Sequence, residues 1–535
     1  MLMVTMDMAR KPNKHFYARL VITATTLATV LPLTAGEWTF NPNLTLDETY
    51  SDNVELKTTD KKESYVNQTR FGLDIAFNSR LAEFNFSGKN TLASYSHDHN
   101  SDDNFITLNS DARYNLWTSG PALIAKVNIA NQSRNSANNG FADIISGDTV
   151  ETRNYQYGIE YNLNNSVYIF NSSFLYQILE ADDNIGESQG YTASIRAHNG
   201  TSARSSLWQL IGTYTERKNN DLSGDMYNIE ALAGMINVYG INPFIRFYDE
   251  NATGSISGNR NTSSSSIGPG LRWIATSHFY IDLSYNYSDD KTKSSNYIAT
   301  AINWQPSTRT TLNVSYNKRF FGNSYHLEFK HKIRRLSNNI SYTETVSAFD
   351  RNTFKQVDLG SFWCPINAPI SDDISACFVS SNSNINFDDF QLINISNQEL
   401  VAGNEFSLNK ILTWKSDFKL ARTSFSLTLN SNNRESLTTN RVEKRENASL
   451  VMIRKISGKS DLNVSLTYRH QQFDKNNIND SAQEDYYRIY STSYSRKLAS
   501  SLSSNITFQY VDRNSSVSTR TYNETRAIIN ITKEF

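Results

Sequence analysis

Apolar and polar residues alternate along most of this chain with a period of two. In the segment 281–288, Ile, Leu, Tyr and Tyr alternate with Asp, Ser, Asn and Ser, and the segments 70–77, 312–317 and 462–469 repeat the arrangement. Successive side chains of a β-strand point to opposite faces. The pattern therefore predicts an all-β protein whose strands each have one apolar and one polar face.

The length of the alternating segments distinguishes a soluble sandwich from a membrane barrel. Sandwich strands average about five or six residues, whereas a strand that crosses the hydrocarbon layer needs about 9–11. The segments here often reach about ten residues or more, which favours the barrel. Tight turns also alternate with longer links rich in Asp, Asn and Ser. The tight turns are predicted near Ser79, Ser119, Asn165, Thr201, Val238, Ser277, Ser307, Leu336, Ser416, Gly458 and Ala499.

Eleven tight turns between successive hairpins imply one large antiparallel transmembrane β-barrel of about 24 strands, in a range of about 20–26. In this class of barrel the short turns face the periplasm and the longer loops face outward. The spacing from Leu336 to Ser416 is roughly double the usual one. We therefore expect the segment 349–404 to form either a long loop or one extra hairpin.

The N-terminal residues 1–36 are typical of a secretory signal peptide. Basic residues precede an apolar run over residues 20–33, and Thr34-Ala35-Gly36 supplies the small residues of a cleavage site. An uncleaved anchor is the alternative, but the run is shorter than the about 20 apolar residues of a spanning helix. We expect residues 37–535 to form the barrel.

The C-terminus carries a pattern typical of the assembly signal of outer-membrane barrels. Ala527, Ile529, Ile531 and Phe535 alternate toward a terminal aromatic residue, and Lys533 interrupts the apolar face. A lysine near the interface can extend its charged end into water. The pattern predicts a multi-pass barrel in the outer membrane of a Gram-negative bacterium, with outer-membrane lipid, lipopolysaccharide and the barrel assembly machinery as partners.

Composition and charge are compatible with this prediction. The mean hydropathy is −0.52, which does not exclude a barrel because only its outer face is apolar. The formal net charge is −1, and no basic stripe suggests nucleic-acid binding. A lumen lined by charges of both signs suits a hydrated path with weak ion selectivity. The candidate lumen-facing residues are Arg70, Asp74, Lys126, Arg196, Arg246, Asp282, Lys330, Lys332 and Arg334.

The chain has two cysteines, Cys364 and Cys377, both within the segment 349–404. Exported proteins enter an oxidising compartment in which nearby thiols pair. We expect a disulfide, with two unpaired thiols in a strand pair as the alternative. A loop closed by this disulfide would either constrict the lumen or stand above the rim of the barrel.

Few residues have the types and spacing of a catalytic or metal-binding site. His97-Asp98-His99 with Asp102 and Asp103 has metal-ligand types, but a polar loop lacks the rigid scaffold of a dedicated site, so we expect an exposed loop. The sequence has no Gly-x-Ser-x-Gly elbow, Gly-rich phosphate loop or Cys-x-x-Cys pair. We therefore expect neither an enzyme nor a cofactor.

The start of the predicted mature chain, Gly36 to Leu44, leads into Tyr50-Ser51-Asp52-Asn53. This stretch resembles the outer-membrane proteins associated with the PEP-CTERM and exosortase systems, which begin with a similar Trp, Pro and Tyr-x-Asp-Asn pattern. The resemblance implies a place in exopolysaccharide production or export, with exopolysaccharide or its secretion components as partners. From their residue types, Trp38 and Tyr50 suit a membrane interface, and Asp52 and Asn53 suit a loop start. Three roles remain open: an export channel, a closed receptor or scaffold, and a general diffusion porin.

Overall fold

The structure is a computed structural model. It describes residues 36–133, 143–147, 149–182, 187–219, 223–237, 239–254, 262–289, 296–347, 352–365, 390–402, 407–436, 442–473, 483–516 and 520–535. For 352–365 and 390–402 only the backbone is described. The predicted signal peptide, apart from Gly36, lies outside these residues. No helix in the described segments is long and apolar enough to cross a membrane.

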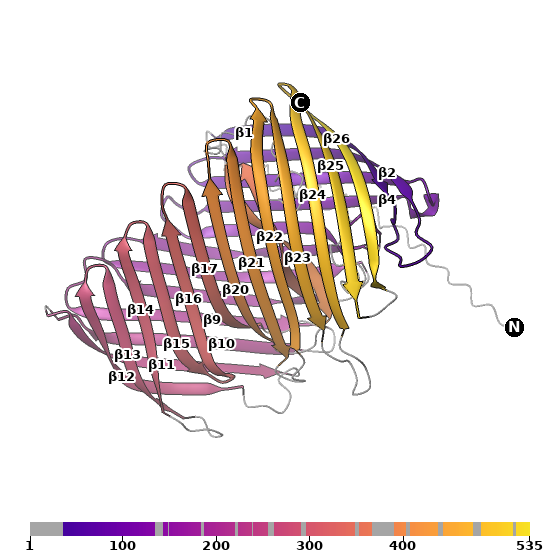
Figure 1. Ribbon diagram of the computed structural model, residues 1–535. Coiled ribbons are helices and arrows are strands. Elements are labelled where there is room, and N and C mark those ends of the chain that lie inside the picture. The colour runs from indigo at the N-terminus through magenta and orange to yellow at the C-terminus, as the bar shows by residue number, and fades with distance from the viewer. Residues whose placement is uncertain are drawn as a thin grey trace.

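Twenty-four of the strands form one antiparallel sheet (Figure 1). Its first half contains β1 (Glu37–Ser51), β2 (Ser64–Asn78), β3 (Ala82–Tyr95), β4 (Asp103–Asn115), β5 (Ala122–Ser133), β6 (Thr149–Asn164), β7 (Tyr168–Ala181), β8 (Ser188–Asn199), β9 (Ser206–Lys218), β10 (Ser223–Met235), β11 (Ile241–Gly254) and β12 (Ser264–Thr276). Its second half contains β13 (Phe279–Ser288), β14 (Tyr297–Ser307), β15 (Thr310–Arg319), β16 (Gly322–Lys332), β17 (Leu336–Ser347), β20 (Ser407–Lys419), β21 (Thr423–Ser436), β22 (Val442–Ser457), β23 (Ser460–Phe473), β24 (Gln483–Ala499), β25 (Leu502–Ser515) and β26 (Tyr522–Glu534). A short 3-10 helix, η1 (His99–Ser101), lies between β3 and β4.

The sheet closes on itself because β1 pairs with both β2 and β26. The pairing of β1 with β26 runs from Asn43 opposite Glu534 to Ser51 opposite Arg526. The backbone N–H of Phe535 extends this seam by donating to the carbonyl of Pro42 over 3.0 Å. Both ends of the barrel chain therefore lie at the same end of the barrel, and the predicted strand number is confirmed.

The short turns lie close to their predicted positions. Ten of the eleven predicted positions fall between the expected pair of strands or on a strand residue next to the turn. Ser416 is the exception, because β20 continues to Lys419 and the turn follows it. The neighbouring Asp417 accepts a hydrogen bond from the Ser426 hydroxyl of β21 at 2.8 Å. The polar inner-face residues near the end of β20 are of the same types as turn residues, so the sequence pattern places this turn too early.

One link on the opposite side is as tight as a short turn. Phe320 and Phe321 alone connect β15 to β16. Gly322 follows with a φ of 116°, a conformation that side chains disfavour. Both phenylalanines pack against a small apolar cluster of Ala252, Val346 and Leu408. On the side of the longer loops, this short link therefore packs against wall residues of β11, β17 and β20.

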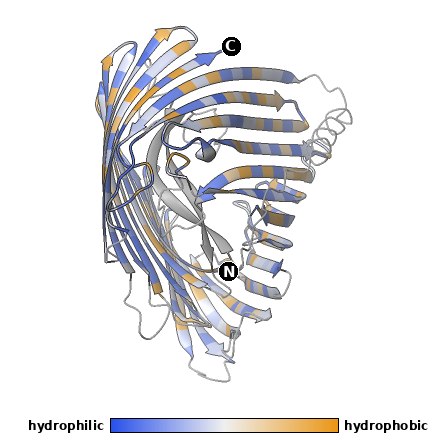
Figure 2. Ribbon diagram, turned by 90° about the vertical axis from the view of Figure 1, so that its right-hand side faces the viewer, coloured by the Kyte–Doolittle hydropathy of each residue, from blue (hydrophilic) through white to orange (hydrophobic). Residues whose placement is uncertain are grey.

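The two faces of the wall differ in polarity. Leu283, Tyr285 and Tyr287 of β13 are 49%, 44% and 54% exposed, whereas Ser284 and Asn286 between them are almost completely buried. Hydrophilic and hydrophobic residues alternate in this way along many strands (Figure 2). An outer surface of exposed large apolar side chains suits lipid, and a polar inner face suits a hydrated lumen.

Residues 349–404 contain an extra hairpin, in which β18 (Asn352–Pro365) pairs with β19 (Phe390–Ala402) as a separate two-stranded sheet. Cα atoms of β18 lie within 8 Å of β21 and β22, and those of β19 lie within 8 Å of β5. These wall strands belong to well-separated arcs of the barrel. The hairpin backbone therefore bridges two sides of the wall.

Candidate functional site

The inner wall carries ion pairs between neighbouring strands. Arg272 of β12 donates two hydrogen bonds to the Asp282 carboxylate of β13, over 2.6 and 2.7 Å. The guanidinium also lies 4.6 Å from the ring centre of Tyr280. A two-point contact with a carboxylate holds Arg in one orientation. This part of the lining is therefore fixed and locally neutral.

Arg246 of β11 lies deeper in the wall and is 5% exposed. Its guanidinium donates to Glu230 over 2.7 Å and to the Tyr297 hydroxyl over 3.3 Å. A buried charge is tolerated only when it is paired and hydrogen-bonded. Arg246 is therefore held in place by its partners, and its main role is to stabilise the lining.

Glu250, also on β11, anchors the tight Phe320-Phe321 link. Arg319 donates to its Oε2 from Nε and Nη2 over 3.0 and 2.7 Å, and the Phe320 N–H donates to its Oε1 over 2.9 Å. The Glu250 side chain is 2% exposed and the Arg319 side chain 13%. One buried carboxylate thus holds the β15–β16 link against the inner wall.

A further network lies at the closing seam. Arg526 of β26 donates to Glu524 over 2.6 Å and to the Ser146 hydroxyl over 2.7 Å, and it also pairs with Asp143. The Ser51 hydroxyl of β1 donates to Glu524 over 2.5 Å. Residues 143–147 belong to the link between β5 and β6, so this part of the link is tied to the seam.

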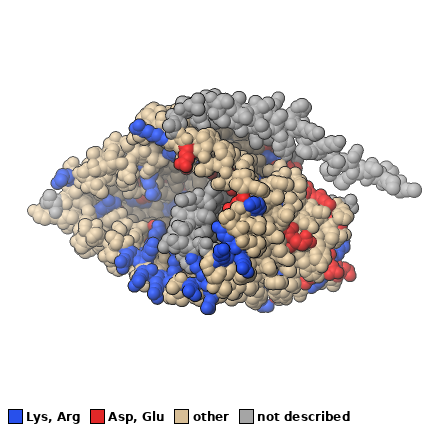
Figure 3. All heavy atoms as spheres, turned by 90° about the horizontal axis from the view of Figure 1, so that it is seen from above, with Lys and Arg blue, Asp and Glu red and all other residues tan. Residues whose placement is uncertain are grey.

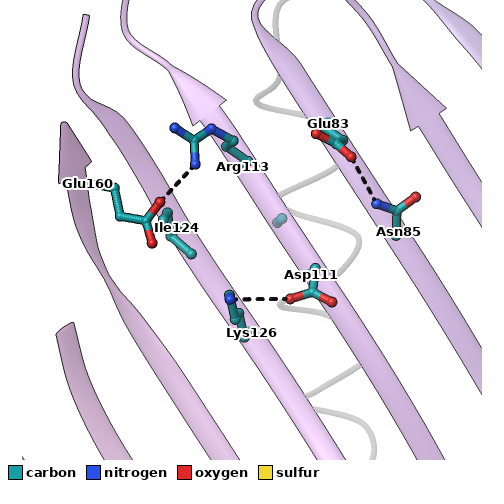
Figure 4. Close-up of a pocket in the computed structure, with 8 residues that line it drawn as sticks. Glu83, Asn85, Asp111, Arg113, Ile124, Lys126 and Glu160 are labelled. Atoms are coloured by element: carbon teal, nitrogen blue, oxygen red, sulfur yellow. Dashed lines mark hydrogen bonds and ion pairs between the residues drawn. The ribbon is translucent and has the colours of Figure 1, made fainter. Parts of the chain in front are cut away.

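The inner wall of β3 to β6 forms a shallow recess of about 180 Å³ near the short turns (Figure 4). Arg113 pairs with Glu160 at 2.8 Å, and the Lys126 ammonium lies 4.0 Å from Asp111. Three carboxylates face two cations here, so the recess is slightly acidic. It is lined by Glu83, Asn85, Asp111, Ala112, Arg113, Ile124, Lys126 and Glu160.

The residues that the sequence suggested for the lumen do not converge on one site. Eight of them lie on the polar faces of six different strands, and their partners, where an ion pair is present, are nearby residues of opposite charge. Arg334 lies in the turn after β16, because that strand ends at Lys332. The eight strand residues are Arg70, Asp74, Lys126, Arg196, Arg246, Asp282, Lys330 and Lys332.

Sequence analysis missed most partners of these residues. The period-two pattern places them on inner faces, but only the strand register shows which charges meet. Arg113 and Glu160 are 47 residues apart, and Arg319 and Glu250 are 69 residues apart. The missed charged residues of the lining include Glu83, Asp111, Arg113, Glu160, Glu230, Glu250, Arg272, Arg319, Glu524 and Arg526.

The C-terminal segment has the expected alternation. Ile529 and Ile531 are 51% and 43% exposed, and Phe535 is 72% exposed. Ala527 shares their strand face. The Lys533 ammonium lies 5.8 Å from the Phe535 ring centre and donates to the Ser501 hydroxyl over 2.5 Å. The lysine is thus accommodated beside the terminal aromatic residue.

The two cysteines lie outside what the structure describes. Cys364 belongs to β18, whose side chains are not described, and Cys377 falls outside the described residues. Their disulfide stays a prediction.

The His/Asp segment between β3 and β4 is held by local hydrogen bonds. Asp102 Oδ1 accepts from the Tyr95 backbone N–H over 2.7 Å, and Oδ2 accepts from the Ser94 hydroxyl over 3.0 Å. The bond from Tyr95 is the main reason that the pKa of Asp102 is lowered. His97 contacts the Ser64 hydroxyl at 2.8 Å. Within the described segments, no group of three or more ligand-type side chains gathers around a metal position.

The Tyr50-Ser51-Asp52-Asn53 stretch stabilises the pairing of β1 with β26 at the end of β1. The Asn53 side chain donates to the carbonyls of Lys57 and Asn523 over 2.8 and 3.0 Å and accepts from the Lys57 N–H over 2.9 Å. Asp52 accepts from the Thr525 N–H over 2.7 Å. The two polar residues of this pattern therefore connect β1, its loop and β26.

A closed antiparallel barrel with an apolar exterior, a charged lining and short turns at one end defines an outer-membrane β-barrel. The protein is located in the outer membrane, where such barrels reside.

No protein-family model matches the chain, and no curated protein is similar to it in sequence. Among solved structures, the siderophore receptor PirA from Pseudomonas aeruginosa is 9% identical with a TM-score of 0.39, and the match covers 93% of this chain and 80% of that one. A ferric enterobactin receptor from the same organism is 11% identical with a TM-score of 0.43, covering 93% and 81%. OmpT of Vibrio cholerae, in a loop-deleted form, is 9% identical with a TM-score of 0.32, covering 94% and 100%.

Proposed function

We propose that the protein is a passive channel or scaffold in the export of exopolysaccharide and of PEP-CTERM surface proteins. The main support is the charged, hydrogen-bonded lining of a wide closed barrel, which suits a hydrophilic path across a lipid layer. The link to this export system comes from the resemblance of the segment 36–54. Under this proposal the partners are lipid, lipopolysaccharide, the barrel assembly machinery, and exopolysaccharide or its secretion components. The proposal assigns no catalytic residue and no cofactor.

The second candidate is a closed barrel that acts as a surface receptor or scaffold. The observation that favours it is the β18–β19 hairpin, whose backbone approaches β5 on one arc and β21 and β22 on another. A hairpin in this position reduces the free cross-section. A general diffusion porin is the third candidate, and it differs from the first in having no dependence on polysaccharide.

Two experiments test these candidates together. The purified full-length protein is inserted into planar bilayers, and the gene is deleted in the native cell. Under the first candidate, deletion lowers surface polysaccharide, and the protein conducts with weak ion selectivity if it is a channel or is silent in bilayers if it is an export scaffold. A surface receptor, or a scaffold outside the export system, is silent in bilayers, and its deletion leaves polysaccharide unchanged. A diffusion porin conducts, but its deletion leaves polysaccharide unchanged. Either of the last two outcomes refutes the first candidate.

A further inference from the structure

Exposed cations are concentrated in one arc of the short turns. Four turns, from β14–β15 to β22–β23, contribute five exposed basic residues that we call the basic crescent. Figure 3 looks onto the side of the molecule where the C-terminus lies in Figure 1, and shows Lys and Arg side chains gathered along one edge. The basic crescent consists of Arg309, Arg334, Arg335, Arg422 and Lys459.

The remaining arc of the same rim has a different character. Among the described residues of the six turns from β2–β3 to β12–β13, Arg80 and Arg204 are the exposed Lys or Arg residues. Trp117 and Tyr239 are the prominent side chains there, 59% and 83% exposed. The four crescent turns are therefore basic, whereas the six turns of the other arc contain two exposed cations and prominent aromatic side chains.

The crescent charges are not neutralised locally. In the described part of the chain, none of the five forms an ion pair, and none of the four turns contains an acidic residue. Two inner-face acids near these turns, Glu328 and Asp417, already have partners. Glu328 accepts from Asn313 over 3.0 Å and pairs with Lys330, and Asp417 accepts from Ser426. The rim therefore presents positive charge to the periplasmic space.

The arrangement of the charges suits an extended partner. Neighbouring strands are about 4.8 Å apart, so the turns of successive hairpins lie roughly 10 Å apart. A polymer with repeated negative charges can contact several turns at once and gains from each added contact, whereas a small anion contacts one or two. Lipid headgroups surround the whole barrel, which does not account for a crescent on one arc. The exposed apolar side chains of these turns, Ile333 and Leu420, are outnumbered by the five cations, whereas the core of a protein interface is depleted in charged residues.

We propose that the basic crescent receives an acidic polysaccharide, one with carboxylate or similar groups along its chain, at the periplasmic mouth. This inference rests on the proposed export function and narrows its substrate class. Lys332 lies at the end of β16, directly inside the crescent, and continues the positive surface onto the inner wall. The acidic recess of β3 to β6 lies on another arc and would keep the polymer on the crescent side.

Binding is tested with the full-length protein in a neutral detergent. The probes are fluorescent oligogalacturonate and a neutral dextran of matched length. The R334Q/R335Q variant removes two crescent charges, and the matched control R80Q/R204Q removes the two exposed cations of the other arc. Since exposed charge contacts are individually weak and screened by salt, we expect R334Q/R335Q to lower oligogalacturonate affinity about threefold to tenfold at low ionic strength.

The control variant should bind like the wild type, and dextran should not bind. Equal losses in both variants, or equal binding of dextran, would overturn the inference. A third probe, nanodiscs containing anionic phospholipid, addresses the other source of negative charge. Binding of that lipid which is weakened in R334Q/R335Q, with no oligogalacturonate binding in detergent, would assign the crescent to lipid and also overturn the inference.

Complementation of a deletion strain separates this inference from the proposed function. We expect the wild type and R80Q/R204Q to restore surface polysaccharide and R334Q/R335Q to restore less of it. A deletion that leaves the polysaccharide unchanged refutes the export function, while the binding result still reports on the crescent. Full restoration by R334Q/R335Q refutes the crescent inference and leaves the export function standing.

Discussion

The Glu250 anchor gives a prediction whose size follows from the structure. Glu250→Gln keeps the volume of the side chain and one acceptor oxygen, but replaces the other oxygen with a donor NH2 group and removes the charge that balances Arg319. The carboxylate is 2% exposed and accepts three hydrogen bonds, two from Arg319 and one from Phe320. Removing one partner of a buried ion pair typically costs about 3–5 kcal/mol. Because Arg319 retains some contact with solvent, we expect a loss near the lower end, about 3 kcal/mol.

The assay is reversible urea unfolding of the protein in detergent micelles, followed by tryptophan fluorescence. Asp249→Asn is the matched control, because Asp249 is the adjacent carboxylate on the opposite face of β11 and has one neutral partner, the Tyr227 hydroxyl at 2.9 Å. We expect it to cost about 1 kcal/mol. Arg319→Met combined with Glu250→Gln should lose less stability than the sum of the single variants, by about 1–3 kcal/mol. Equal effects of E250Q and D249N, together with strict additivity, would refute the anchor.

Three other predictions concern separate parts of the chain. Deletion of Phe535 should impair membrane insertion far more than deletion of one residue from a longer loop, because it shortens the closing seam; an unchanged yield of heat-modifiable protein on unboiled gels would contradict this. Cys364 and Cys377 should form a disulfide that closes a loop of about 14 residues and stabilises it by about 3 kcal/mol in the chain-entropy model; mass analysis that finds two alkylatable thiols in exported protein would exclude it. The pKa of Asp102 is lowered in the folded state, so its contribution to stability is present above the unfolded value of about 4 and is lost as the pH falls through the folded value. The protection factor of the Tyr95 amide in hydrogen exchange should therefore fall in acid, and D102N should remove that pH dependence; an identical pH profile in D102N would show that another group is responsible.

The sequence predicted the strands and their faces because both depend on local information. The period of two places Ser284 and Leu283 on opposite faces without knowledge of any partner strand. Turn positions followed from the same pattern, except at Ser416, where inner-face polar residues next to the turn obscured the end of the strand. The number of strands then followed from the number of turns.

The candidate site was predicted only in part, because cross-strand contacts depend on register. Asp282 was recognised as a lining residue, but its partner Arg272 was not, since the sequence does not show which positions of β12 and β13 face each other. Arg334 was assigned to a strand face although β16 ends two residues earlier. The basic crescent was missed for a related reason. Its members lie far apart in the sequence, and the pairing of successive strands, including β17 with β20, places their turns side by side in one arc.

The central claim is that the wall has a lipid-facing and a lumen-facing side in the outer membrane, and adjacent residues of one strand test it most directly. In a background with Cys364 and Cys377 replaced by serine, Leu283→Cys and Ser284→Cys are each labelled with a small fluorophore, in protein reconstituted into bilayers with spin-labelled lipid. Leu283 is 49% exposed on the apolar face, and Ser284 is 4% exposed on the polar face. The account predicts strong quenching by lipid at position 283 and weak quenching at 284. Equal quenching by lipid at both positions, or stronger quenching at 284, would contradict it.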